Sequence, residues 1–111
     1  MIKRGEIYWV NLDPTIGSEI RKTRPAVVVS NDINNLHAQT VTVVPLSSSI
    51  GKVHPFEVLL PAGLTGTREE SKAKANQIRT VDKQRLGKSA GLVTAGLMEK
   101  LDEALRLHLD L

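Results

Sequence analysis

Ten residues decide how this chain folds: Thr23-Arg24-Pro25-Ala26-Val27-Val28-Val29-Ser30-Asn31-Asp32. The apolar, mostly β-branched run at 26–29 predicts a strand that is covered on both faces. Pro25 fixes its own backbone and favours an extended conformation for Arg24, so a guanidinium is held at the mouth of this strand. A guanidinium held so firmly is typical of a phosphate-binding group, although an arginine at a strand end can also simply pair with a carboxylate. The Asn31-Asp32 dipeptide then turns the chain.

The composition is typical of a soluble globular protein. The chain has 111 residues, of which 41% are hydrophobic and 24% charged, and we expect one domain spanning 1–111. Because the chain contains no cysteine, disulfides and thiolate metal sites are excluded. The N-terminus has no apolar signal core, and no stretch approaches the length of a membrane span. These features favour a cytoplasmic protein.

The net charge indicates, weakly, a nucleic-acid partner. The formal charge is +3 and the isoelectric point is about 9.5, which is mildly basic. Proteins that bind single strands by base stacking usually offer several exposed rings, and this chain has only Tyr8, Trp9 and Phe56. We expect most of these rings to pack in the core. Phosphate contacts and hydrogen bonds would then carry most of the affinity for a nucleic acid.

Apolar patterns and turn signals predict five strands and one helix. The strands are expected at residues 6–12, 24–30, 40–46, 55–60 and 73–81. The helix is expected at 94–109, with Thr94 as its N-cap and one apolar face made of Leu97, Met98, Leu101, Ala104, Leu105 and His108. A loop at 15–23, a connection at 31–39 and a turn at 47–52 join these elements, and Asp82 is expected to cap a turn. Short strands followed by one helix favour a small, strongly bent sheet or barrel with the helix packed on it.

The second and third predicted strands place an arginine near a hydroxyl group. Their connection is short enough to favour antiparallel neighbours, so the start of one strand lies beside the end of the other. Arg24 is then expected next to Leu46 and Ser47, below the 15–23 loop. Loops of that length are often functional lids.

An arginine and a hydroxyl favour phosphoryl transfer over other chemistry. Metal catalysis is disfavoured because His37, His54 and His108 are scattered along the chain without ligand spacing. A bidentate donor stabilises the charge that develops on phosphate oxygens. RNA also carries its own nucleophile, the 2′-OH. A chain with few histidines and no cysteine is therefore compatible with a ribonuclease that needs no metal or other cofactor.

Five blocks, in order over nearly the whole chain, resemble the MazF/PemK toxin endoribonuclease family: Gly5-Glu6-Ile7-Tyr8-Trp9-Val10, Asp13-Pro14-Thr15-Ile16-Gly17-Ser18-Glu19, Arg24-Pro25-Ala26-Val27-Val28, Val44-Pro45-Leu46-Ser47 and Gln77-Ile78-Arg79-Thr80-Val81-Asp82. The resemblance implies a mostly β, SH3-like β-barrel of five or more strands with a C-terminal α-helix, assembled as a homodimer. It implies the toxin of a type II toxin–antitoxin system, an mRNA interferase that cuts single-stranded RNA sequence-specifically without metal. The implied products are a 2′,3′-cyclic phosphate and a 5′-OH. The implied partner is an antitoxin whose acidic, partly disordered tail covers the RNA groove.

The resemblance also implies roles for individual residues. Arg24 matches the catalytic arginine, and Ser47 matches the hydroxyl position, which is threonine in many members. Ser48 is a neighbouring candidate, because either hydroxyl of a strand end could face the site. The RNA-binding residues are expected to be Glu19, Arg21, Lys22, Ser48, Lys52, Gln77 and Arg79. The general base is left open between water and Glu19, although a glutamate there could simply pair with Arg21 or Lys22. Gln77 is suited either to a base edge or to a structural hydrogen bond.

Two other classes of function stay open. The first is a toxin of the same fold that inhibits DNA gyrase and cuts nothing, which would need neither Arg24 beside a hydroxyl nor the block around Gln77. The second is a catalytically inert module that only holds RNA or a peptide.

Overall fold

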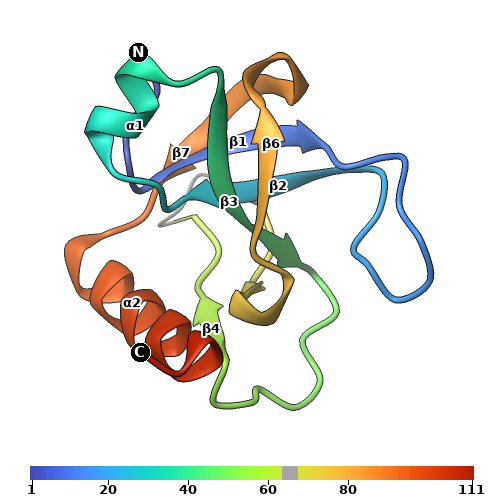
Figure 1. The fold of residues 1–111 in the computed structure, drawn as a ribbon. Coiled ribbons are helices and arrows are strands. Elements are labelled where there is room, and N and C mark those ends of the chain that lie inside the picture. The colour runs from blue at the N-terminus through green and yellow to red at the C-terminus, as the bar shows by residue number, and fades with distance from the viewer. Residues whose placement is uncertain (64–67) are drawn as a thin grey trace.

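The structure, a computed structural model, describes residues 1–63 and 68–111, in which an antiparallel sheet packs against a C-terminal helix (Figure 1). The strands within this part of the chain are β1 Glu6–Asn11, β2 Thr23–Val28, β3 Thr40–Ser47, β4 Glu57–Leu60, β5 Ser71–Lys74, β6 Arg79–Asp82 and β7 Leu86–Leu92. The helices are α1 Asp32–His37, α2 Ala95–Leu109 and the short 3-10 turns η1 Ala75–Gln77 and η2 Lys83–Arg85. The mostly β architecture with a C-terminal α-helix, predicted from the sequence, is confirmed.

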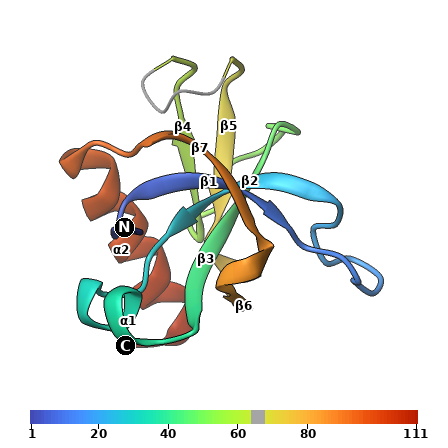
Figure 2. The same cartoon turned by 90° about the horizontal axis from the view of Figure 1, so that it is seen from above.

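The sheet is strongly bent. The strand order is β4-β5-β3-β2-β1-β7, with β6 paired to β3, and each of these pairings is antiparallel. In both views β3 runs across the direction of β1 and β2 (Figures 1 and 2). Among the described strands this order leaves β4 and β7 at opposite ends, so these strands do not close into a barrel. The loop between β1 and β2 projects on the side of the sheet away from α2.

Two apolar clusters lie on opposite faces of the central strands. Along β2, Val27 belongs to the cluster that α2 covers with Met98 and Leu101. Its neighbours Ala26 and Val28 belong to the second cluster. Ala26, Val27 and Val28 are all fully buried. The strand is therefore covered on both faces, as the run of valines predicts.

The single strand predicted at 73–81 is wrong, because two strands and a turn occupy this segment. Leu46 of β3 pairs with Ala73 of β5, whereas Val43 of β3 pairs with Arg79 of β6. The two residues of β3 are thus three positions apart in the sequence, whereas the residues with which they pair are six positions apart. The three-residue turn η1 supplies the difference. This break lets one segment pair with both ends of β3.

Other predictions were wrong at polar segments and at the rim of the core. Helix α1 lies in the predicted connection, because the Asn31 side chain accepts a hydrogen bond from the Asn34 N–H and caps a short helix where a turn was expected. Strand β7 was not predicted at all. His108 is exposed, because the buried face of α2 ends at Ala104.

The N-cap at Thr94 is confirmed, and so is the cap at Asp82, which accepts from the Gln84 N–H at 2.8 Å.

Glu57 is a buried carboxylate held by two lysines. Its side chain is 1% exposed and lies 3.2 Å from Nζ of Lys72 and 3.6 Å from Nζ of Lys74. The backbone N–H of His54 donates to it at 2.9 Å. Burial alone would raise the pKa of the Glu57 carboxyl, but the His54 hydrogen bond and the two lysine charges outweigh this effect and lower the pKa below its ordinary value of 4.5.

We expect the free energy of unfolding to fall as the pH drops below 4.5, in part because of Glu57. A carboxyl whose pKa is lowered by folding stabilises the protein above its unfolded-state pKa, and this contribution is lost as the pH falls through the folded-state pKa. Glu57→Gln should flatten this acid-side slope and cost about 3 kcal/mol at pH 7, because Lys72 stays buried without a carboxylate to balance its charge. Urea unfolding at several pH values measures both effects, with exposed Glu99→Gln on α2 as the control. An unchanged slope in Glu57→Gln would contradict the assignment.

Candidate functional site

A cavity lies where β3 separates from β2. The ladder between these strands ends at Ala26 and Pro45, and from Leu46 onward β3 pairs with β5. Arg24 and Ser47 therefore do not form a ladder pair, although the antiparallel arrangement predicted for the two strands is confirmed. A cavity of about 650 Å³ lies beside the parted strand ends. We call it the Arg24 cavity, and its lining is Trp9, Arg24, Pro25, Leu46, Ser48, Arg68, Glu69, Ser71, Lys88, Ser89 and Ala90.

Positive charge dominates the Arg24 cavity. Arg24, Arg68 and Lys88 line it together with the carboxylate of Glu69. Nε of Arg24 donates to the Arg21 carbonyl at 3.3 Å, which orients the exposed guanidinium. Among the described residues no carboxylate forms an ion pair with Arg24, so the strand-end ion pair considered above is not found there. The cavity is suited to an anionic, phosphate-bearing ligand.

The two candidate hydroxyls lie differently at the end of β3. Ser48 is exposed and lines the Arg24 cavity with Arg24, whereas Ser47 is not part of its lining. Oγ of Ser47 accepts a hydrogen bond from the Ser49 N–H at 3.2 Å, which holds the turn after β3. A hydroxyl that accepts one hydrogen bond still has its own proton to donate. Both serines thus remain able to donate to a phosphate oxygen.

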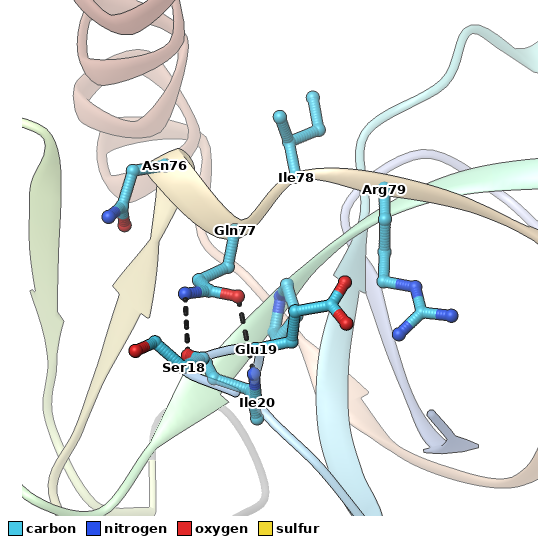
Figure 3. A pocket seen from close by; sticks show the side chains of 8 residues that line it. Ser18, Glu19, Ile20, Asn76, Gln77, Ile78 and Arg79 are labelled. Atoms are coloured by element: carbon cyan, nitrogen blue, oxygen red, sulfur yellow. Dashed lines mark hydrogen bonds between the residues drawn. The ribbon is translucent and has the colours of Figure 1, made fainter. Parts of the chain in front are cut away.

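Gln77 lies in a second cavity, of about 340 Å³, next to the loop between β1 and β2; we call it the Gln77 cavity. Figure 3 shows its amide aimed at the loop backbone. Oε1 accepts from the Ile20 N–H and Nε2 donates to the Ser18 carbonyl, each at 3.2 Å. The Gln77 amide thus bonds one backbone N–H and one backbone carbonyl of the loop, as a neighbouring β-strand would do. Of the two interpretations of Gln77, the structural hydrogen bond is the one that the structure contains.

Two arginines hold the base of the same loop. Nη1 of Arg79 donates to the Leu12 carbonyl at 3.0 Å, and Nη1 of Arg85 donates to the carbonyls of Asn11 and Asp13. The Leu12 N–H donates to the carbonyl of Lys22 at 2.9 Å, which closes the loop. Hydrogen bonds from Gln77, Arg79 and Arg85 therefore hold this loop as a fixed part of the fold. The sequence had suggested a lid.

The remaining predicted RNA-binding residues lie on loops and turns. Glu19 lines the Gln77 cavity, and its carboxylate accepts the Ile16 N–H at 2.6 Å. Arg21, Lys22 and Lys52 are exposed, and none of them lines the Arg24 cavity. Their contact with RNA stays a prediction.

Replacing Gln77 by methionine should loosen the loop without unfolding the protein. Methionine has a similar length but makes neither hydrogen bond, so we expect a loss of about 1 kcal/mol for each bond. Amide hydrogen exchange at Ile20, whose N–H donates to Gln77, should accelerate. The exposed neighbour Asn76 gives the matched control, Asn76→Ala. Unchanged exchange at Ile20 in Gln77→Met would show that the loop is held elsewhere.

Sequence reasoning missed several residues of the Arg24 cavity. Lys88 was overlooked because β7 was not predicted, and Arg68 because it follows a predicted turn. Trp9 was expected among the core rings, but it is 42% exposed and lines the cavity. Ser71 also lines it, and its buried Oγ has no hydrogen-bond partner in the described part of the chain. Only the spatial arrangement brings these four together.

A small, strongly bent antiparallel sheet with a C-terminal helix packed on it, and a basic cavity beside the sheet, defines the chain as a compact β-rich protein. Residues 3–109 match the model of a family described as "PemK-like, MazF-like toxin of type II toxin-antitoxin system". The match covers nearly the whole sequence. The chain belongs to this family.

Relatives and solved structures agree with this assignment. The chain is 52% identical to endoribonuclease MazF9 of Mycobacterium tuberculosis, over 100% of this chain and 98% of the relative. It is 38% identical to endoribonuclease EndoA of Bacillus subtilis, over 100% and 97% of the two chains. A solved structure of a mycobacterial endoribonuclease in complex with its cognate antitoxin superposes with a TM-score of 0.82 at 27% identity, over 100% and 97%.

The described residues contain neither a cluster of metal-binding side chains nor a helix that could span a membrane. Within residues 1–63 and 68–111, no three histidine, aspartate or glutamate side chains gather in a way that could hold a metal ion. In the same residues, no helix combines the length and the apolar character needed to cross a membrane.

Proposed function

We propose that this chain is the toxin of a type II toxin–antitoxin system and an endoribonuclease that cleaves single-stranded mRNA at specific sequences in the cytoplasm. The observation that carries the proposal is the Arg24 cavity, whose lining brings together the Arg24 guanidinium and the Ser48 hydroxyl. The curated relatives above, named endoribonucleases, support it. We further propose that the 111 residues act as one domain and pair as a homodimer.

The proposed reaction needs no metal or cofactor. The 2′-oxygen of the RNA attacks the adjacent phosphorus, and the bond from phosphorus to the 5′-oxygen of the next nucleotide breaks. The proton of the 2′-OH leaves to solvent, and the 5′-oxygen takes up a proton. The products are a 2′,3′-cyclic phosphate and a 5′-OH. Arg24 stabilises the charge that develops on the phosphate oxygens, and a hydroxyl at the end of β3, that of Ser47 or of Ser48, donates a hydrogen bond to them.

Incubating the purified protein with a transcript of varied sequence, in the presence of EDTA, tests this function. We expect cuts at a recurring short sequence, and mapping their positions gives the recognition sequence. If the RNA stays intact while DNA gyrase loses its supercoiling activity, the protein is a gyrase inhibitor of the same fold. If RNA binds but stays intact and gyrase is unaffected, it is an inert binding module.

Removing both candidate hydroxyls should slow the cut without weakening the fold. For the double variant Ser47→Ala/Ser48→Ala we expect kcat to fall about a hundredfold, as when a single preorganised donor is removed. The single variants assign the loss to one serine or share it between them. Ser49→Ala, in the same turn, is the control. A double variant that cuts at the wild-type rate would exclude both hydroxyls from the reaction.

The proposed partner is an acidic antitoxin. A peptide carboxylate can occupy the position of a phosphate, and three cations line the Arg24 cavity. The mycobacterial endoribonuclease that superposes on this chain was solved with its cognate antitoxin, which supports this proposal. A polyglutamate peptide should therefore compete with RNA and inhibit cleavage more strongly at low salt than at high salt.

A further inference from the structure

Trp9 is placed unlike the other apolar residues of its strand. Its neighbours in β1, Ile7 and Val10, are fully buried, whereas Trp9 is 42% exposed. Neither apolar cluster of the described residues includes it. Because single exposed apolar residues are common on protein surfaces, the role of Trp9 must be judged from the residues that surround it.

The pairing of β1 with β7 is irregular at Trp9. Tyr8 pairs with Ser89 and Val10 with Leu86, so that two residues of β7, Gly87 and Lys88, lie opposite the single Trp9. Such a bulge redirects side chains next to functional sites. Gly87 lies close to the main chain of Trp9 here, since a Cβ at this position would be 3.4 Å from the Trp9 carbonyl oxygen.

The bulge brings an aromatic face and cations to one cavity. Trp9 lines the Arg24 cavity with Arg24, Arg68 and Lys88, and it pairs with Pro25, the residue that fixes the backbone of Arg24. Grooves that bind single strands combine cations for the phosphates with aromatic rings for the bases. At about 650 Å³ the cavity is within the range of small-ligand sites and has room for one nucleotide.

We propose that Trp9 stacks on the base of a nucleotide that adjoins the scissile phosphate. This inference rests on the proposed ribonuclease function and adds a base-binding residue to it. A stacked base fixes the ribose and phosphate next to Arg24, because the nucleotide is held from both of its ends. Stacking accepts any base, so Trp9 provides affinity and position, and sequence recognition comes from other residues.

Two substitutions of Trp9 separate stacking from packing. Trp9→Phe keeps an aromatic face, and Trp9→Leu keeps apolar volume without one. We expect kcat/KM on the mapped RNA to fall about tenfold to a hundredfold in Trp9→Leu, mainly through KM, and to change less than about threefold in Trp9→Phe. Phe56→Leu is the matched control, because Phe56 stacks on His54 and is not part of the Arg24 cavity.

Fluorescence gives a readout that a purely structural role would not change. Trp9 is the sole tryptophan, so its emission reports on this position alone. An RNA of the mapped sequence, with 2′-deoxyribose at the cut nucleotide, should quench this emission in a saturable way. Equal kcat/KM values in Trp9→Leu and Trp9→Phe, or RNA binding without any change in emission, would overturn the stacking role. Wild-type cleavage is measured in the same assay, so a failure of the ribonuclease function itself is seen separately.

Discussion

Replacing Arg24 by lysine is expected to lower the rate of RNA cleavage about a thousandfold. Lysine keeps the positive charge but presents a single ammonium group, whereas a guanidinium holds two phosphate oxygens in a fixed, planar arrangement. The loss should appear in kcat rather than KM, because the charge on the phosphate oxygens grows in the transition state. The fold should survive, since Arg24 is exposed and donates one hydrogen bond, to the Arg21 carbonyl, within the described structure.

Single-turnover cleavage of the mapped RNA measures this effect, and thermal unfolding checks the fold. Exposed Arg106 in the last turn of α2 provides the matched control, Arg106→Lys, which should cut at the wild-type rate. If Arg24→Lys retains more than about a tenth of the wild-type kcat, charge alone is sufficient and the bidentate role assigned to Arg24 is wrong.

The second large effect concerns the substrate. Replacing the ribose at the cut nucleotide by 2′-deoxyribose should abolish cleavage, because the nucleophile of the proposed reaction is the 2′-oxygen of that residue. Binding should persist, because the phosphates that meet the cations of the Arg24 cavity are unchanged. Filter binding measures the affinity, and a gel measures cleavage of the same labelled oligonucleotide.

Deoxyribose at the neighbouring nucleotides serves as the control and should still permit cleavage. The masses of the fragments from the all-ribose substrate should correspond to a 2′,3′-cyclic phosphate and a 5′-OH. Cutting at the deoxyribose position would require water or a protein group as nucleophile, and would refute the internal mechanism.

The fold could be predicted where the sequence pattern depends on burial alone. The valines of β2 and β3 and the apolar face of α2 mark buried surfaces, so these elements and the antiparallel arrangement of β2 and β3 followed from the sequence. Strand β7 could not be predicted in this way, because its sequence, Leu86 to Leu92, contains two glycines and none of its residues is fully buried. The break at η1 depends on the register of two ladders on β3, which is a tertiary property.

The candidate site was predictable to a similar extent. Arg24 was singled out as a candidate because Pro25 restricts it and a buried strand follows, which are local properties, whereas its catalytic role was implied by the family resemblance. Trp9 and Lys88 depend on the bulge between β1 and β7, which no local pattern indicates. The function of Gln77 depends on which backbone lies opposite it, and that backbone is about sixty residues earlier in the chain.

The anchoring of the β1–β2 loop has a consequence for chimeric proteins. The loop could be exchanged with that of a relative in order to alter which RNA is recognised. Gln77, Arg79 and Arg85 would then lie against the main chain of a foreign loop. A transplanted loop should adopt its parental shape only when the donor's residues at these three positions accompany it. The unit that can be grafted is thus discontinuous in sequence, a loop together with a remote short segment.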